Sequence, residues 1–88
     1  KLGSYNIIGT NVVLDSGVVV GDFCTIMSAA TIAPNVNIGN DVFIGTGAVV
    51  VSGVTIGNKA RIGAGSVVVE SVPDGATFFG NPATKVKS

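Results

Sequence analysis

The chain has 88 residues, of which 47% are hydrophobic and only 11% are charged. Soluble domains usually carry roughly 25% charged residues. A chain of this length supports one small domain, and so few charges favour a surface that is covered by partner subunits. No run of about 18 apolar residues escapes interruption by glycine or polar residues, which excludes a membrane-spanning helix.

The single cysteine, Cys24, excludes an intramolecular disulfide framework. No secretory signal peptide is recognisable. Both features favour a reducing compartment, so a cytoplasmic location is expected.

The net charge is zero, but its distribution is uneven. Residues 1–58 carry one lysine against three aspartates, a net charge of −2, and residues 59–88 carry the balancing +2. The basic C-terminal third is compatible with a phosphorylated ligand or with an ordinary solvated surface. It is too sparse for a nucleic-acid footprint.

From residue 8 onward, every sixth position is aliphatic. A helix would need apolar spacing of 3.6 and a half-buried strand a spacing of 2, so neither explains this period. A period of six predicts a parallel β-helix over residues 6–71, with the recurring side chains in its core. The eleven predicted core residues are Ile8, Leu14, Val20, Ile26, Ile32, Ile38, Ile44, Val50, Ile56, Ile62 and Val68.

Each six-residue unit is expected to contain a short strand followed by a tight corner. Small or β-branched residues, Cys24 among them, stand two positions before the core residue. Glycine often follows the core residue, and we expect it there because it tolerates dihedral angles that a Cβ would obstruct. These glycines are residues 9, 21, 39, 45, 57 and 63.

A longer period of eighteen indicates how many sides the coil has. The segment 45–51 recurs closely at 63–69, eighteen residues later. Eighteen residues are three units, so the predicted fold is all-β, a triangular prism of about 3.7 coils. Core residues eighteen apart should then stack in columns about 4.8 Å apart along the axis.

The period ends at residue 71, and residues 72–88 are expected to form a cap. Val72-Pro73-Asp74-Gly75 is typical of a turn. A short strand over 76–79 and a loop over 80–83 should follow. Packing in the cap is the expected role of both phenylalanines, and stacking on a ligand is the alternative. Covering the last coil would protect an otherwise open sheet edge.

Several segments carry a family resemblance, above all 44–50, 62–68 and the closing Gly80-Asn81-Pro82-Ala83. Through them the chain resembles the hexapeptide-repeat, left-handed β-helix acyltransferases, and most closely the sialic-acid O-acetyltransferase and bacillosamine N-acetyltransferase group. The resemblance implies a left-handed coil, a homotrimer, and acetyl-CoA as acyl donor. It also implies a sugar or nucleotide-sugar acceptor. Members usually carry an N-terminal nucleotide-sugar-binding domain, so residues 1–88 are expected to be an isolated C-terminal domain.

The resemblance also assigns residues to an acetyl-CoA groove between adjacent prisms. Stacked corners offer backbone N–H groups at fixed spacing, which suits the amides and carbonyl of a pantetheine thioester. The glycines in this set equally suit plain corners without a ligand. By matching position, Thr25, Pro34, Thr46 and Ala64 line the groove, Gly45, Gly47, Gly63 and Gly65 permit close approach, and Lys59, Arg61 and Lys85 are candidates for the phosphates.

The chain contains no histidine, although many members of the family use one as general base. The matching position is Ser16, which follows Asp15, and a second family histidine corresponds to Thr25. A serine hydroxyl cannot accept a proton as imidazole does, so Asp15 is the substitute candidate. Without histidine, the zinc site of the related γ-class carbonic anhydrases is excluded, and no metal is expected.

Two functions follow from these observations. The first is transfer of an acetyl group from acetyl-CoA to an amino or hydroxyl group of a sugar. The second is a catalytically silent trimeric module that has kept the coil and lost the base.

Overall fold

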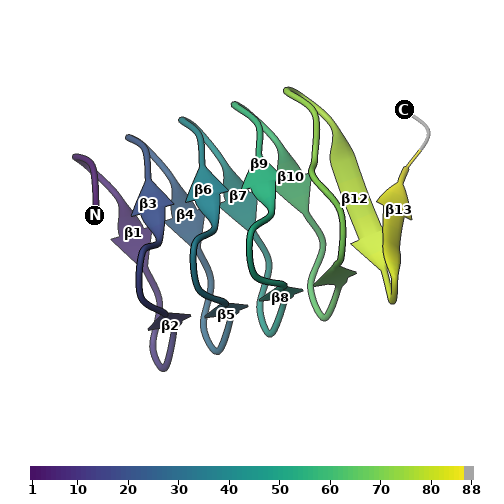
Figure 1. The fold of residues 1–88 in the computed structure, drawn as a ribbon, viewed down its shortest axis with the longest axis horizontal. Coiled ribbons are helices and arrows are strands. Elements are labelled where there is room, and N and C mark those ends of the chain that lie inside the picture. The colour runs from purple at the N-terminus through teal and green to yellow at the C-terminus, as the bar shows by residue number, and fades with distance from the viewer. Residues whose placement is uncertain (87–88) are drawn as a thin grey trace.

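The computed structural model describes residues 1–86, and they wind into a tube of short strands (Figure 1). Within these residues the structure contains no helix, and therefore none that could cross a membrane. Eleven strands have two residues each: β1 (Ile7–Ile8), β2 (Val13–Leu14), β3 (Val19–Val20), β4 (Thr25–Ile26), β5 (Thr31–Ile32), β6 (Asn37–Ile38), β7 (Phe43–Ile44), β8 (Val49–Val50), β9 (Thr55–Ile56), β10 (Arg61–Ile62) and β11 (Val67–Val68). Two longer strands follow, β12 (Thr77–Gly80) and β13 (Ala83–Lys85).

The strands form three flat faces. Face 1 holds β1, β4, β7, β10 and β12, face 2 holds β2, β5, β8 and β11, and face 3 holds β3, β6 and β9. All pairs within these faces are parallel. The chain passes from face 1 to face 2 to face 3 in a left-handed sense (Figure 1), opposite to the usual parallel crossover. The predicted left-handed triangular β-helix is confirmed.

Three corners join the faces. Corner 1/2 comprises residues 9–12, 27–30, 45–48 and 63–66, corner 2/3 comprises 15–18, 33–36, 51–54 and 69–71, and corner 3/1 comprises 3–6, 21–24, 39–42, 57–60 and 73–76. Val72 bridges Ile56 on face 3, which completes about four coils, slightly more than the expected 3.7.

The predicted columns are present. On face 1, Ile26 aligns with Ile44 and Ile44 with Ile62, and the three side chains are 0% exposed. The columns of the other faces are also in register. Ile8 lies in its column but is 37% exposed, and Leu14 is half-buried, because the first coil has none below it. The core is therefore dense everywhere except at this end.

The position two before each core residue is also buried, and it fills the inside of the corners. Cys24 is one example: it is 1% exposed and its Sγ donates to the Gly39 carbonyl at 3.0 Å. Burial raises the pKa of the Cys24 thiol, so the thiol is a packing group and a poor nucleophile. Ser66 is the polar member of the set, and its Oγ accepts a hydrogen bond from the Gly80 N–H at 3.1 Å.

The left-handed backbone conformation occurs three positions after each core residue except Val68, which differs from the expectation. The residues in the corners with positive φ are Tyr5, Asn11, Gly17, Phe23, Ala29, Asn35, Asp41, Gly47, Gly53, Lys59, Gly65 and Gly75. The glycines directly after the core residues have ordinary φ angles. A Cβ on Gly45 would lie 2.5 Å from the Ala64 nitrogen in the next coil. Those glycines are therefore required by close stacking of coils, and the dihedral explanation for them was wrong.

The C-terminal residues form a hairpin in which β12 pairs with β10 and β13 pairs antiparallel with β12. Phe78 aligns with Ile62 and is 4% exposed, so it closes the core as expected. Phe79 is 57% exposed, and the contact of its ring with Gly63 is only a partial packing in the cap. Residues 83–85 form a strand where part of a loop was expected. Residues 87–88 of the predicted cap lie outside the described residues.

The core columns make one substitution decisive. Ile44→Asp places an unpaired carboxylate among fully buried side chains and should reduce the free energy of unfolding by more than about 4 kcal/mol. Thermal unfolding followed by circular dichroism measures the effect. Ile7→Asp is the matched control, because Ile7 is 66% exposed on the same face. Equal melting temperatures for the two variants would contradict the column assignment.

Candidate functional site

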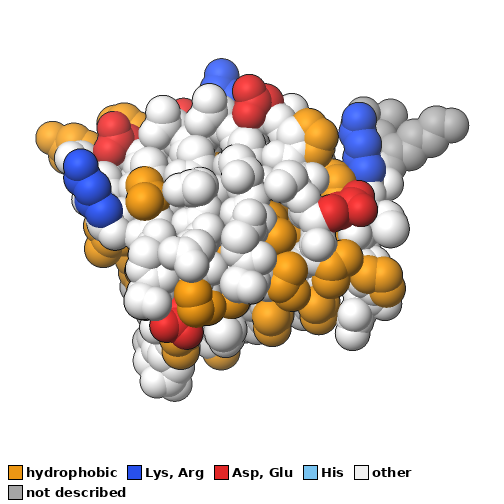
Figure 2. Space-filling model, in the orientation of Figure 1, with side chains coloured by type: hydrophobic (Ala, Val, Ile, Leu, Met, Phe, Trp, Pro, Cys, Tyr) orange, Lys and Arg blue, Asp and Glu red, His pale blue; other side chains and the backbone are white. Residues whose placement is uncertain are grey.

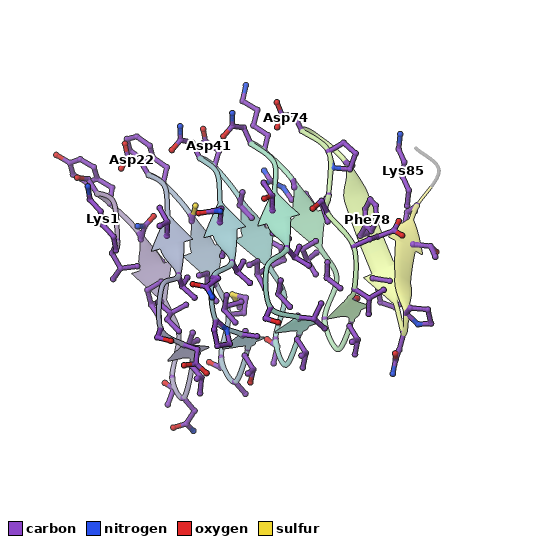
Figure 3. The ribbon with its side chains drawn as sticks, viewed as in Figure 1. Lys1, Asp22, Asp41, Asp74, Phe78 and Lys85 are labelled. Carbon is purple, nitrogen blue, oxygen red and sulfur yellow. The ribbon has the colours of Figure 1, made fainter. Side chains whose placement is uncertain are left out.

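At each corner, the backbone N–H two positions after the core residue does not take part in the hydrogen bonds between strands. The three corners differ in whether a side chain accepts a hydrogen bond from it. At corner 3/1, an aspartate or asparagine in the next coil accepts it. The Asp22 N–H donates to Asn40 Oδ1 at 2.8 Å, and the Asn40 N–H donates to Asn58 Oδ1 at the same distance. The ladder continues from the Asn58 N–H to Asp74 Oδ1. Figure 3 shows Asp22 and Asp74 along this edge of the prism. At corner 3/1, side chains of the protein itself therefore accept the hydrogen bonds of these N–H groups.

Corner 1/2 has no such ladder. Among the described residues, the N–H groups of Thr46 and Ala64 have no acceptor. The residue above Thr46 in the next coil is Ala64, whose methyl group cannot accept a hydrogen bond. Both residues are exposed. The N–H groups of Thr10 and Ser28, in the same slot of the first two coils, also have no acceptor among the described residues. Corner 1/2 thus presents a row of unsatisfied donors, one per coil, at a spacing of about 4.8 Å.

The four predicted glycines of this corner divide into two pairs. Gly45 and Gly63 have no room for a Cβ, which would strike Ala64 in one case and the Phe79 ring in the other. Gly47 and Gly65 have φ of 70° and 69°, and a Cβ on either would enter open space. Gly45 and Gly63 therefore have a packing role. Gly47 and Gly65 place no side chain beside the free donors, which remain accessible.

Asp15, Ser16 and Pro34 lie at corner 2/3, on the opposite edge of face 2. Asp15 is exposed, and its Oδ1 accepts the Ser16 N–H at 2.7 Å. This contact orients the carboxylate and leaves Oδ2 available. Pro34 stands one coil above Ser16 and has no N–H. In one protomer, face 2 separates these residues from the free donors of corner 1/2.

The remaining predicted residues lie elsewhere. Thr25 and Arg61 belong to the outward column of face 1, with Phe43 between them. The Arg61 guanidinium donates to the Asp41 carbonyl at 2.7 Å, which directs it toward corner 3/1. Lys59 is exposed on that corner. Lys85 lies on the C-terminal hairpin beside Phe78 (Figure 3). One protomer does not bring the three cations together at corner 1/2.

The outer surface of face 2 is apolar, a feature that the sequence reasoning missed. Its outward column is Val13, Thr31, Val49 and Val67, none of them charged. Figure 2 shows hydrophobic side chains gathered over the C-terminal part of this face. The valine triplets 49–51 and 67–69 were the available signal, because strand side chains alternate and two of every three must point outward.

The described residues enclose no pocket. In the same part of the chain, no three potential His, Cys, Asp or Glu ligands cluster to hold a metal ion.

Comparison with known proteins agrees with this architecture. Residues 35–70 match the family model described as bacterial transferase hexapeptide, six repeats. No curated protein sequence matches the chain significantly. Many solved structures do match.

Three solved structures illustrate the similarity. The serine acetyltransferase of Neisseria gonorrhoeae is 33% identical with a TM-score of 0.95, over 99% of this chain and 37% of that one. A serine acetyltransferase in complex with CoA is 30% identical with a TM-score of 0.84, over 92% of this chain and 39% of that one. A mutant of AntD, an N-acyltransferase from Bacillus cereus, in complex with dTDP and coenzyme A, is 25% identical with a TM-score of 0.89, over 96% and 60%. The chain thus spans 37–40% of the length of the serine acetyltransferases that it matches.

The division of the glycines is testable by stability. Gly47→Ala should reduce the free energy of unfolding by about 1 kcal/mol, the cost of a Cβ at positive φ. Ala29 shows that alanine fits this slot, with φ of 64°. Gly45→Ala should cost more, because its Cβ meets backbone. Melting temperatures give the order, at about 4–8 °C per kcal/mol. A larger loss for Gly47→Ala would refute the packing role of Gly45.

Proposed function

Because residues 35–70 match the family model of the bacterial transferase hexapeptide, we propose that the chain is the β-helical part of an acyltransferase that takes an acetyl group from acetyl-CoA. The observation that carries the proposal is the pair of unsatisfied N–H groups of Thr46 and Ala64 beside the open glycines at 47 and 65. A pantetheine arm has two amide carbonyls and a thioester carbonyl, and all three need donors. The CoA complexes of similar structures support this ligand.

The functional unit that we propose is a homotrimer. The candidate residues lie on both edges of face 2, and a second copy packed beside this face would bring corner 2/3 of one protomer near corner 1/2 of its neighbour. The outward valines of face 2 are suited to such burial. The groove would then hold Thr46 and Ala64 from one protomer, with Asp15 and Pro34 from the other.

The proposed chemistry is attack of an amine or hydroxyl group on the thioester carbonyl. The new C–N or C–O bond forms, the C–S bond breaks, and the proton released by the nucleophile goes to a base or to the CoA thiolate. Backbone N–H donors stabilise the oxyanion that develops. A neutral amine needs less help from a base than a hydroxyl does, so the absence of histidine favours N-acylation.

Asp15 is the proposed base, with Ser16 fixing its orientation through the hydrogen bond from its backbone N–H. The acceptor that we propose is an amino sugar or nucleotide-linked sugar, and serine is the competing acceptor because serine acetyltransferases are among the similar structures. Thr25 would lie near the thioester, and Lys59, Arg61 and Lys85 are the proposed partners of the CoA phosphates.

Binding of acetyl-CoA tests the donor site. Thr46→Pro removes the N–H. Pro34 occupies the equivalent position at corner 2/3 and is followed by Asn35 with φ of 63°, so a proline is compatible with this corner geometry. Affinity measured by calorimetry should fall about tenfold, the net value of one or two hydrogen bonds. Thr46→Ser keeps the N–H and should bind as the unaltered chain does. Absence of binding by the unaltered chain at millimolar acetyl-CoA would remove the proposed function.

Turnover separates the enzyme from a silent module. Asp15→Asn keeps the oxygen that accepts the Ser16 N–H but removes the basic carboxylate. Release of the CoA thiol in the presence of amino sugars or serine should fall about a hundredfold, the lower range for a general base. Asp41→Asn, at another exposed aspartate, is the control. A chain that binds acetyl-CoA but releases no thiol with any acceptor would instead be a structural module.

A further inference from the structure

Phe79 is a large apolar side chain that lies mostly outside the core. Its neighbour Phe78 closes the core at 4% exposure, whereas Phe79 remains 57% exposed. The register of β12 on β10 places Phe79 above Gly63, at the C-terminal end of corner 1/2. A Cβ on Gly63 would collide with Cδ1 of the Phe79 ring. The ring therefore rests against a glycine backbone, and much of its surface is open to solvent.

The location of this ring continues the row of free donors. Thr46 lies two coils below Phe79, and Ala64 lies one coil below, next to Gly63 in the chain. With about 4.8 Å per coil, the ring lies roughly one nanometre along the axis from the Thr46 donor. Between them the corner carries only the small residues Ala64 and Gly65. An extended ligand that follows the donors toward the C-terminus would meet the aromatic ring next.

CoA has one flat aromatic group, its adenine, at the end of the molecule remote from the thioester. Adenine stacks on exposed aromatic rings, and each such contact is commonly worth enough to change affinity several-fold to a hundredfold. An arm lying on the Thr46 and Ala64 donors with its thioester toward the coil of Thr25 has its adenine directed to the Phe79 end. The aromatic character of Phe79 and its place at the adenine end of the arm therefore point to the same ligand group.

We propose that Phe79 is the stacking platform for the adenine ring of CoA, seated by the absence of a side chain at Gly63. The inference rests on the proposed function, including the position of the thioester near Thr25, and refines it by naming the residue that holds the adenine. Alternation along β12 turns Phe78 into the core and leaves Phe79 on the outer surface, where a ligand can reach it.

The test compares two ligands on the 88-residue chain by calorimetry. CoA carries the adenosine group, and 4′-phosphopantetheine shares the arm but lacks adenosine. Phe79→Ala should weaken CoA binding about tenfold and leave phosphopantetheine binding unchanged. Phe79→Tyr keeps an aromatic ring and should retain the affinity for CoA. Phe79→Leu keeps apolar volume without a ring and should lose it, which preserves the test if the alanine variant folds poorly.

Phe23→Ala is the matched control, because Phe23 is 58% exposed but lies on corner 3/1. It should not change the affinity for either ligand. Sedimentation of each variant shows whether assembly is intact. Equal weakening of both ligands by Phe79→Ala, or no weakening, overturns the role of Phe79 while the CoA site stands. Failure of the unaltered chain to bind either ligand overturns the proposed function, and this inference with it.

Discussion

Direct stacking of each coil on the one before is the constraint on which the structure depends. Backbone hydrogen bonds run along the axis, for example from the Gly45 N–H to the Ile62 carbonyl at 2.8 Å. They hold residues eighteen apart in register, and the buried columns of Ile, Val and Leu supply the hydrophobic free energy. Because the spacing between coils is constant, any group repeated at a corner is repeated in space at the same interval.

Because of this stacking, every corner has one backbone N–H per coil outside the hydrogen bonds between strands, and the corners differ in what accepts it. One spare N–H per coil must be satisfied by the protein, by water or by a ligand. Corner 3/1 satisfies it with a ladder of Asp and Asn side chains, as from Asp22 to Asn40. Corner 1/2 carries Thr46 and Ala64 in this slot and leaves the donors free. A regular scaffold thus acquires an edge with free donors through the side chains of one corner, and this edge is the proposed binding site.

Prediction from sequence succeeded where one local rule repeats. The columns and the buried Cys24 follow from a period of six, because a core that repeats needs the same residue type each time. The three-sided coil follows from the longer period of eighteen. The dihedral explanation failed at Gly45, because positive φ occurs elsewhere and glycine is required by the coil above. The different exposures of Phe78 and Phe79 were not predicted either. The sequence shows only two adjacent phenylalanines, and the register of β12 decides which of them faces the core.

The candidate site was less predictable than the fold. The resemblance named residues at corner 1/2, at corner 2/3 and on face 1, but their distribution over two edges of face 2 emerges only when the coil is built. By itself, the sequence determined the repeat, the core and the absence of histidine, since these are properties of residue type and spacing. The tertiary structure alone decided which N–H groups remain free and which glycines face open space. Both depend on the residue that stands eighteen positions away in the neighbouring coil.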